Sequence, residues 1–260
     1  MLGGVPEGDS LHRVARALQP LVGARVAATS PSARGRATGV AAAIDGLLLE
    51  EVRAVGKHLL LRFEGGVTVR SHLRLNGRWR VLPPDAQVGG SPWLVLRTPA
   101  ATAVQANGPV LTLLSGATPL PALGPDLLGD EVDVSGLVAR LRASDPSRPL
   151  GEVLQDQRLV AGIGNMWASE GLWEARLHPL LPVAAATDRD LTLVLGRLRE
   201  AMRAAVTGRR PRHAVYRRAG RPCPRCATPV VSRGVGDANR TAYLCPSCQV
   251  LPAARPPAAC

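Results

Sequence analysis

The sequence predicts an α+β protein with an N-terminal β-sandwich or barrel, a helical region and a C-terminal β-hairpin held by four cysteines. Three observations support this fold class. Short β-rich runs alternate with Gly/Pro turns from Ala24 to Leu114. Helical periodicity follows between residues 134 and 207. Two Cys-x-x-Cys pairs then enclose a short turn. The chain of 260 residues is long enough for two domains with cores of their own.

The N-terminal region begins with an expected helix across Leu11–Leu18, where apolar residues recur at helical spacing and Ser10 stands in a capping position. Several short runs after it are typical of strands, because they are β-rich and bounded by turn residues. A Pro/Gly/Ala-rich stretch, Ser115–Pro125, is expected to be a linker. The clearest expected strands are Lys57–Phe63, Gly66–His72, Gly77–Leu82, Trp93–Arg97 and Val110–Leu114.

The helical region is expected to hold four helices. The last is the best delimited, because Thr187 and Asp190 have the spacing of a capping box and Gly208 follows the final turn. The second has a proline near its first turn. The expected helices are Val134–Ala143, Pro149–Gln155, Asn165–Glu174 and Asp188–Thr207.

The composition is strongly basic, with a formal net charge of +12 and a pI of about 11.1. This charge favours an acidic polymer such as nucleic acid as partner, although charge also promotes solubility by repulsion. Lys57 is the only lysine among 32 Lys and Arg residues. Unlike arginine, lysine readily loses its proton and can act as an acid or base, so we expect a chemical role for Lys57. Chance survival on a surface strand is the alternative.

The cysteine pairs Cys223/Cys226 and Cys245/Cys248 are separated by 18 residues. Four thiolates at this spacing predict a tetrahedral, structural Zn²⁺ site, with a redox disulfide or an iron–sulfur cluster as alternatives. A closed four-cysteine site has no open coordination position, so the metal is expected to hold shape only. The residues between the pairs are typical of a β-hairpin. Arg240 lies in it, where it could contact a phosphate or simply be solvated.

A glycine-rich turn joins the second and third expected helices. Gly162 and Gly164 allow the backbone to approach a ligand closely. The N-terminus of the next helix, at Asn165, offers a positive dipole end and an amide side chain to a phosphate. Ordinary helix capping is the more common explanation of such a turn.

The pair Pro6-Glu7 near the start of the chain suggests covalent catalysis. A proline with a free amine can attack a sugar aldehyde carbon and form an iminium ion, which is an electron sink. As printed, residues 1–5 acylate Pro6, and an amide nitrogen is inert. One hypothesis is that Val5 marks a GUG start codon, in which case removal of the initiator methionine exposes Pro6. Alternatively, Pro6-Glu7 only opens the first helix.

Taken together, four segments resemble the formamidopyrimidine-DNA glycosylase/endonuclease VIII family across about residues 6–249, and most closely the endonuclease VIII branch. These segments occur in the family's order. The resemblance implies an N-terminal β-sandwich, a helix–two-turn–helix domain and a zinc finger, with DNA held between the lobes. The segments are Pro6-Glu7-Gly8-Asp9, Gly56-Lys57-His58, Ala161-Gly162-Ile163-Gly164-Asn165 and Arg240 with the four cysteines.

The resemblance also implies catalytic roles for individual residues. Pro6 would attack C1′ of a damaged nucleotide, and Glu7 would protonate the opening sugar. Lys57 would act in the acid–base steps of β-elimination. Arg240 is the residue usually assigned to δ-elimination, but its high pKa favours a role as a phosphate clamp. Asn165 would bind the backbone beside the lesion.

The turn between His72 and Gly77 resembles the family's void-filling loop, which fills the stack when a base is extruded. Leu75 would be the apolar wedge, with Arg74 and Asn76 beside it; an ordinary turn with a core leucine is the alternative. The loop Gln105–Pro109 lacks the arginine and phenylalanine of the oxidised-purine branch. Oxidised pyrimidines are therefore the expected substrates.

The function expected from this resemblance is a bifunctional DNA glycosylase and abasic-site lyase of base excision repair, which nicks the strand by β- or β,δ-elimination. We expect a monomer that binds damaged double-stranded DNA and one structural Zn²⁺, without a small-molecule cofactor. No secretory signal or membrane-length apolar run is evident, which favours the cytoplasm, in association with the nucleoid. Expected parts are a catalytic sandwich (6–120), the helix–two-turn–helix domain (126–210), the zinc finger (215–250) and a disordered tail (251–260).

Two rival functions stay open at this point. A non-catalytic zinc-finger protein that binds damaged DNA would result if residues 1–5 keep Pro6 acylated, since a family fold does not guarantee retained chemistry. A general zinc-ribbon nucleic-acid protein unrelated to repair would leave Pro6-Glu7 and the lone Lys57 without an explanation.

Overall fold

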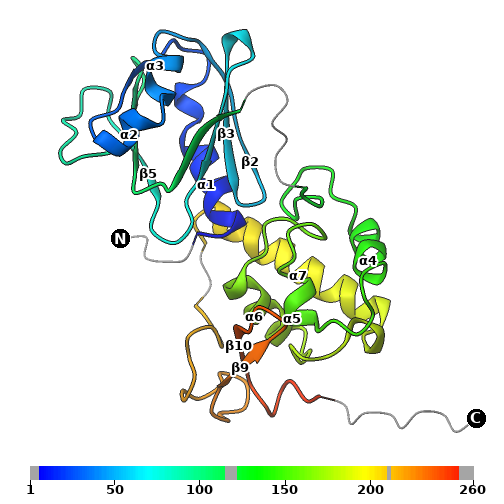
Figure 1. Ribbon diagram of the computed structural model, residues 1–260. Helices are drawn as coiled ribbons and strands as arrows, with labels where there is room; N and C mark the ends of the chain where they lie inside the picture. The colour runs from blue at the N-terminus through cyan, green and yellow to red at the C-terminus, as the bar shows by residue number, and fades with distance from the viewer. Residues whose placement is uncertain (1–5, 115–121, 210–211, 252–260) are drawn as a thin grey trace, which may run out of the picture. The chain divides into compact units, whose positions relative to one another are not determined.

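The structure is a computed structural model that describes residues 6–114, 122–209 and 212–251 (Figure 1). The chain divides into two compact units, residues 1–128 and 129–260. Most of the expected linker Ser115–Pro125 and nearly all of the expected tail lie outside the described residues, as do residues 1–5. Within the described residues, no helix is both long enough and apolar enough to cross a membrane.

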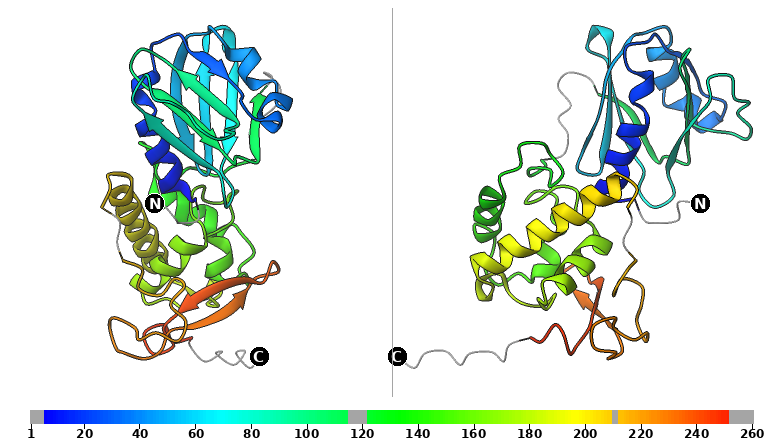
Figure 2. Two further views of the ribbon diagram at one scale, coloured as in Figure 1. Left: turned by 90° about the vertical axis from the view of Figure 1, so that its left-hand side faces the viewer. Right: turned by 180° about the vertical axis from the view of Figure 1, so that it is seen from behind.

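The N-terminal unit contains two four-stranded antiparallel sheets, which Figure 2 shows from two further directions. One has the strand order β1-β6-β7-β5 and the other β2-β3-β4-β8. Every pairing between neighbours is antiparallel. The strands are β1 (Ala27–Thr29), β2 (Leu49–Val55), β3 (His58–Phe63), β4 (Thr68–His72), β5 (Arg78–Leu82), β6 (Leu94–Arg97), β7 (Thr102–Ala106) and β8 (Val110–Leu114).

One apolar core joins the two sheets, so the predicted β-sandwich is confirmed. Leu59, Leu61 and Phe63 of β3 alternate with the outward-facing side chains and are fully buried. Leu94 and Leu96 of β6 belong to the same core cluster. Helix α1 (Gly8–Ala17) packs against β2 and β3 and buries its apolar face in this core.

Three local expectations for this unit were wrong. Helix α1 begins at Gly8 rather than Leu11, because the extended backbone of Glu7 already places its carbonyl to accept from Ser10 N–H and Leu11 N–H. Ser10 therefore lies inside the helix and does not cap it. Two short helices interrupt the region that was expected to hold strands only. They are α2 (Ala33–Ala37), capped by the Ser32 side chain, and α3 (Val40–Ile44).

Among its described residues, the C-terminal unit contains four α-helices and a two-stranded antiparallel sheet. The capping box of Thr187 and Asp190 is confirmed, and Gly208 follows the helix with a φ of +98°. Helices α6 and α7 approach so closely that a Cβ on Gly171 would lie 2.5 Å from a methyl carbon of Leu198. The elements are α4 (Val134–Arg142), α5 (Leu150–Val153), α6 (Asn165–Glu174), α7 (Asp188–Val206), β9 (Val231–Val235) and β10 (Arg240–Leu244).

The expected hairpin between the cysteine pairs is confirmed as β9 and β10, and β10 packs against α6. Helix α5 is shorter than expected and ends at Val153, where the chain turns toward α6. Three single-turn 3₁₀ helices complete the described elements of the chain: η1 (Gln19–Leu21), η2 (Glu64–Gly66) and η3 (Val183–Ala185).

Candidate functional site

Lys57 lies in the tight turn between β2 and β3, whose last ladder pair is Val55 with His58. The turn needs a left-handed residue, and Gly56 supplies it with a φ of +57°. The Gly56 N–H donates to Oδ2 of Asp126 over 2.7 Å. The same carboxylate lies 2.8 Å from Nε2 of His12 on α1 and accepts the N–H of Leu128. Asp126 thus fixes the backbone on which Lys57 stands.

Two histidines pack together next to Lys57. The ring of His58 meets that of His72 edge-on at a centroid distance of 4.9 Å. His58 is buried, and its Nδ1 has no hydrogen-bond partner within the described residues. Burial, then electrostatic interactions with His72, Arg70 and Lys57, lowers the pKa of His58 to about 4. Burial and Arg74 also lower the pKa of His72. Both rings are therefore neutral at pH 7 in a cationic neighbourhood.

Pro6 and Glu7 directly precede α1. Glu7 is the N-cap residue of this helix and is almost fully buried, whereas Pro6 is half-buried. The structure therefore places the predicted acid beside the predicted nucleophile, and it is also compatible with the simple opening of a helix.

The turn between β4 and β5 exposes Leu75, which is 70% accessible to solvent. Leu75 is therefore not a core residue. Arg74 adopts a φ of +46°, and its N–H donates to Nδ1 of His72 over 3.0 Å. The turn closes through a hydrogen bond from Gly77 N–H to the carbonyl of the buried Leu73. This arrangement presents an apolar side chain at the tip of a well-defined turn.

In the C-terminal unit, Asn165 contacts the strand on which Arg240 lies. Asn165 opens α6, and its Nδ2 donates to the carbonyl of Thr241 over 2.8 Å. Its Oδ1 is buried and has no partner among the described residues. Arg240 precedes Thr241 on β10 and donates from Nη1 to Oε1 of Gln155 over 3.3 Å. The glycine-rich turn therefore contacts the hairpin twice, through the Asn165 amide at the Thr241 backbone and through Gln155 at the Arg240 guanidinium.

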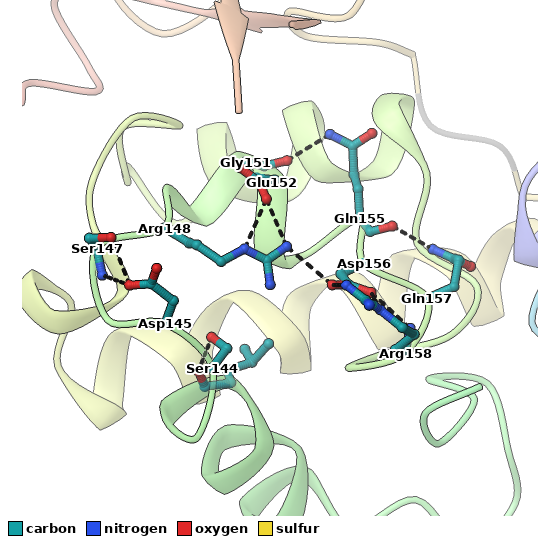
Figure 3. A network of polar contacts seen from close by, with 11 residues as sticks. Ser144, Asp145, Ser147, Arg148, Gly151, Glu152, Gln155, Asp156, Gln157 and Arg158 are labelled. Atoms are coloured by element: carbon teal, nitrogen blue, oxygen red, sulfur yellow. Dashed lines mark hydrogen bonds and ion pairs between the residues drawn. The ribbon is translucent and has the colours of Figure 1, made fainter. Parts of the chain in front are cut away.

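A polar network stabilises the segment that leads into this turn (Figure 3). Arg148 donates to Glu152 over 2.8 Å and to Asp156 over 3.1 Å. The Asp156 carboxylate also pairs with Arg158, whose hydrogen bonds and charge hold the pKa of Asp156 well below its usual range. Sequence reasoning missed this network, although Arg148 and Glu152 have the i, i+4 spacing of a helical ion pair.

The four predicted ligands, Cys223, Cys226, Cys245 and Cys248, lie with their Sγ atoms within 4.8 Å of one another. The separation is 3.4 Å between Cys226 and Cys245 and 4.0 Å between Cys223 and Cys248. Tetrahedral coordination with metal–sulfur bonds of about 2.3 Å requires sulfur atoms about 3.8 Å apart. The cluster therefore fits a single metal ion.

Side chains of α6 attach the cysteine module to the helical part of the C-terminal unit. Trp173 donates from Nε1 to Sγ of Cys223 over 3.4 Å, and the Arg225 guanidinium stacks 3.7 Å from the Trp173 ring. Glu170 accepts the backbone N–H groups of Ala214, Val215 and Tyr216, the last over 2.7 Å. Neither Glu170 nor Asp126 was found from the sequence, because acceptors of backbone N–H groups have no spacing pattern.

Comparison with known proteins gives matches along most of the chain. The model of the formamidopyrimidine-DNA glycosylase N-terminal domain matches residues 5–107, and that of the formamidopyrimidine-DNA glycosylase H2TH domain matches residues 123–213. The chain is 41% identical to the probable endonuclease 8 2 of Streptomyces coelicolor, over 97% of this chain and 96% of that protein. It is 34% identical to the formamidopyrimidine-DNA glycosylase of Thermus thermophilus, over 94% of this chain and 98% of that protein.

A solved structure supports the same fold. The Lactococcus lactis formamidopyrimidine-DNA glycosylase, bound to DNA that contains an abasic site, superimposes with a TM-score of 0.78 at 23% identity. The match covers 94% of this chain and 100% of the other. The similarity thus extends through both units.

Proposed function

Because the chain belongs to the formamidopyrimidine-DNA glycosylase family, we propose that it is a bifunctional DNA glycosylase and abasic-site lyase of base excision repair. The single observation that carries the proposal is the 41% identity to a probable endonuclease over nearly the full length of both chains. The strongly basic composition and the two sets of candidate residues are consistent with it.

The chemistry is assigned to the N-terminal unit. With a free amine, Pro6 attacks C1′ of the damaged nucleotide; the C1′–base bond breaks, and the base leaves with the bonding electrons and the proton that the amine releases. An iminium ion forms when the C1′–O4′ bond of the sugar then breaks. Glu7 donates the proton that opens the sugar ring, a role that suits a buried carboxyl group. Lys57, held by the Gly56–Asp126 hydrogen bond, exchanges protons during elimination of the 3′ phosphate. Leu75 enters the space left by the extruded base, with Arg74 and Asn76 beside it.

Binding of the DNA backbone is assigned to the C-terminal unit. Asn165 and Arg240 offer an amide and a guanidinium to one phosphate, and the N-terminus of α6 adds its dipole. Zn²⁺ is the metal that four cysteines at this spacing favour, and its contribution is to hold the hairpin that carries Arg240. We further propose that the enzyme acts as a monomer in the cytoplasm, in association with the nucleoid.

Oxidised pyrimidines are the proposed substrates. The start Pro6-Glu7-Gly8-Asp9 and the segment Gln105–Pro109, which spans the end of β7 and the connection to β8 and lacks arginine and phenylalanine, favour this class. Relatives named as endonuclease 8 and relatives named as formamidopyrimidine-DNA glycosylase both match the chain, so these two segments and not the matches support this choice. Measured excision of thymine glycol and of 8-oxoguanine from otherwise identical duplexes tests it, and faster release of 8-oxoguanine would contradict it.

Borohydride trapping on a duplex with one abasic site tests the lyase activity. Two forms of the protein provide a matched pair: one begins at Pro6 with a free amine, and the other carries residues 1–5 before it. We expect a covalent adduct with the first form alone, because an acylated nitrogen cannot form an imine.

A Lys57→Arg variant of the first form controls for the only lysine amine, and its adduct should map to Pro6. An adduct with the acylated form would place the nucleophile elsewhere. If neither form is trapped while both bind abasic DNA tightly, the protein is a damage-binding protein without lyase chemistry.

A further inference from the structure

The hairpin of β9 and β10 lies directly on α5 and α6. A Cβ on Gly236, at the hairpin turn, would lie 2.3 Å from Oε2 of Glu152, and one on Gly151 would lie 3.2 Å from Cγ1 of Val235. The backbone of Tyr243 also approaches the Ser169 hydroxyl over 3.4 Å. These close approaches define the surface on which Arg240 is presented.

Gln155 is the polar residue that meets Arg240 on this surface. It is only 6% exposed, and its Nε2 donates to the carbonyl of Gly151 over 2.7 Å. The opposite amide orientation would place an oxygen against that carbonyl and an NH₂ against the guanidinium. Both contacts are repulsive, so the two neighbours fix Oε1 toward Arg240.

The chain around Gln155 is itself held in place, as Figure 3 shows. The backbone carbonyl of Gln155 accepts from Nε2 of Gln157 over 2.9 Å, and Gln157 also bonds Ile163 and Gly162 in the glycine-rich turn. On the other side, Arg148 ties Glu152 to Asp156. The amide is therefore anchored by both the helix and the turn.

We propose that Gln155 is a positioning residue that orients the Arg240 guanidinium for a DNA phosphate, an inference that rests on the proposed function. A neutral amide uses one of the five N–H donors of the guanidinium and leaves its charge uncompensated. Within the described part of the chain, Arg240 forms no ion pair. A carboxylate at position 155 would instead neutralise the charge that attracts the phosphate. Gln155 therefore orients the Arg240 guanidinium without neutralising its charge.

A double-mutant cycle tests the proposal, with binding of an abasic duplex and the single-turnover nicking rate as readouts. Gln155→Met keeps the volume of the buried side chain but removes the acceptor. We expect the Kd to rise about fivefold, as for the loss of one hydrogen bond of average strength, with little change in the rate at saturating DNA. In an Arg240→Ala background the same substitution should have no further effect.

Two further variants make the cycle specific. Arg233→Ala removes another exposed arginine of the hairpin that does not contact Gln155, and its effect should add to that of Gln155→Met. Gln155→Glu retains an acceptor but adds a charge, so the slope of log Kd against log salt should fall by about one.

An equal loss on Gln155→Met with and without Arg240 would overturn the proposal, because Gln155 would then act through the fold. A parent protein that neither binds nor is trapped on abasic DNA would contradict the proposed function itself. A parent that is active while Gln155→Met matches it in Kd would refute only the role of Gln155.

Discussion

The two units hold their candidate residues by different physical means. In the N-terminal unit, Lys57 and Leu75 stand on turns of a sandwich with an apolar core, and one carboxylate, Asp126, fixes the turn at Lys57. In the C-terminal unit, Asn165 and Arg240 depend on side-chain hydrogen bonds and on a four-cysteine cluster. The sandwich core thus supports the first pair of residues with one polar contact added, whereas the second pair is held mainly by polar contacts and by the cysteine cluster.

Removal of the metal should have the largest effect on DNA binding. It should disrupt the C-terminal hairpin and leave the fold of the N-terminal unit unchanged. Chelation or Cys226→Ser is expected to unfold the hairpin, because a structural zinc site contributes on the order of 10 kcal/mol to folding. Binding of abasic DNA should fall more than about 100-fold. Hydrogen exchange checks the contrast. Amides of β9 should lose protection while those of β3 keep it. Equal loss of protection in both strands would contradict the claim that the two units are stabilised independently.

Each unit has one carboxylate that accepts backbone N–H groups, Glu170 in the C-terminal unit and Asp126 in the N-terminal unit, and their removal should have the next largest effects. Glu170→Ala leaves three backbone N–H groups without their acceptor and should lower the free energy of unfolding by about 3 kcal/mol. Asp126→Ala should cost about 2 kcal/mol and should also slow nicking, because the Lys57 turn loses its anchor. Urea denaturation and single-turnover rates measure both effects. An Asp126→Ala variant with the parent nicking rate would show that Lys57 is positioned without this carboxylate.

Protonation of the buried His58 should have a smaller effect, confined to acidic pH. Burial and neighbouring cations lower its pKa to about 4, below the ordinary value of 6.5. Between these values the unfolded chain binds a proton that the folded chain does not, so stability falls as the pH decreases from 6.5 to 4. His58→Leu should reduce this acid-dependent decrease in the free energy of unfolding by about 1–2 kcal/mol, after allowance for solvent screening. Parallel stability–pH curves for variant and parent would contradict this assignment.

Leu75→Ala should have the smallest effect on folding, within about 0.5 kcal/mol, because the side chain is exposed. Base excision from duplex DNA should nevertheless slow several-fold, whereas nicking of a preformed abasic site in single-stranded DNA should not change. Thermal melting and the two rates check this. An equal loss on both substrates would argue against a wedge.

The sequence predicted those parts that local patterns determine. β-Rich runs bounded by turn residues located β3 to β6 and β8 to within two residues, and Thr187 with Asp190 located the start of α7. Cysteine spacing identified the metal-binding cluster. The strands, the capping box and the cysteine pairs each depend on residues close together in the chain, so the local sequence pattern is enough to predict them.

Other features depend on contacts between distant segments, and the sequence did not reveal them. Asp126 meets Gly56 across 70 residues, and Gln155 meets Arg240 across 85. A buried glutamine at a helix end looks like any polar residue until its partner is known. The start of α1 was misplaced for a related reason, since the backbone of Glu7 replaces the expected side-chain cap.

The division of roles between the units is the central claim, and one kinetic comparison tests it most directly. Lys57→Arg and Asn165→Ala would be made in the form that begins at Pro6, and Kd and the single-turnover nicking rate at saturating abasic duplex would be measured for each. We predict a rate at least about 100-fold lower with nearly unchanged Kd for Lys57→Arg. Asn165→Ala should raise Kd about tenfold with a nearly unchanged rate. A pattern in which Asn165→Ala lowers the saturated rate, or Lys57→Arg acts only on Kd, would contradict the account.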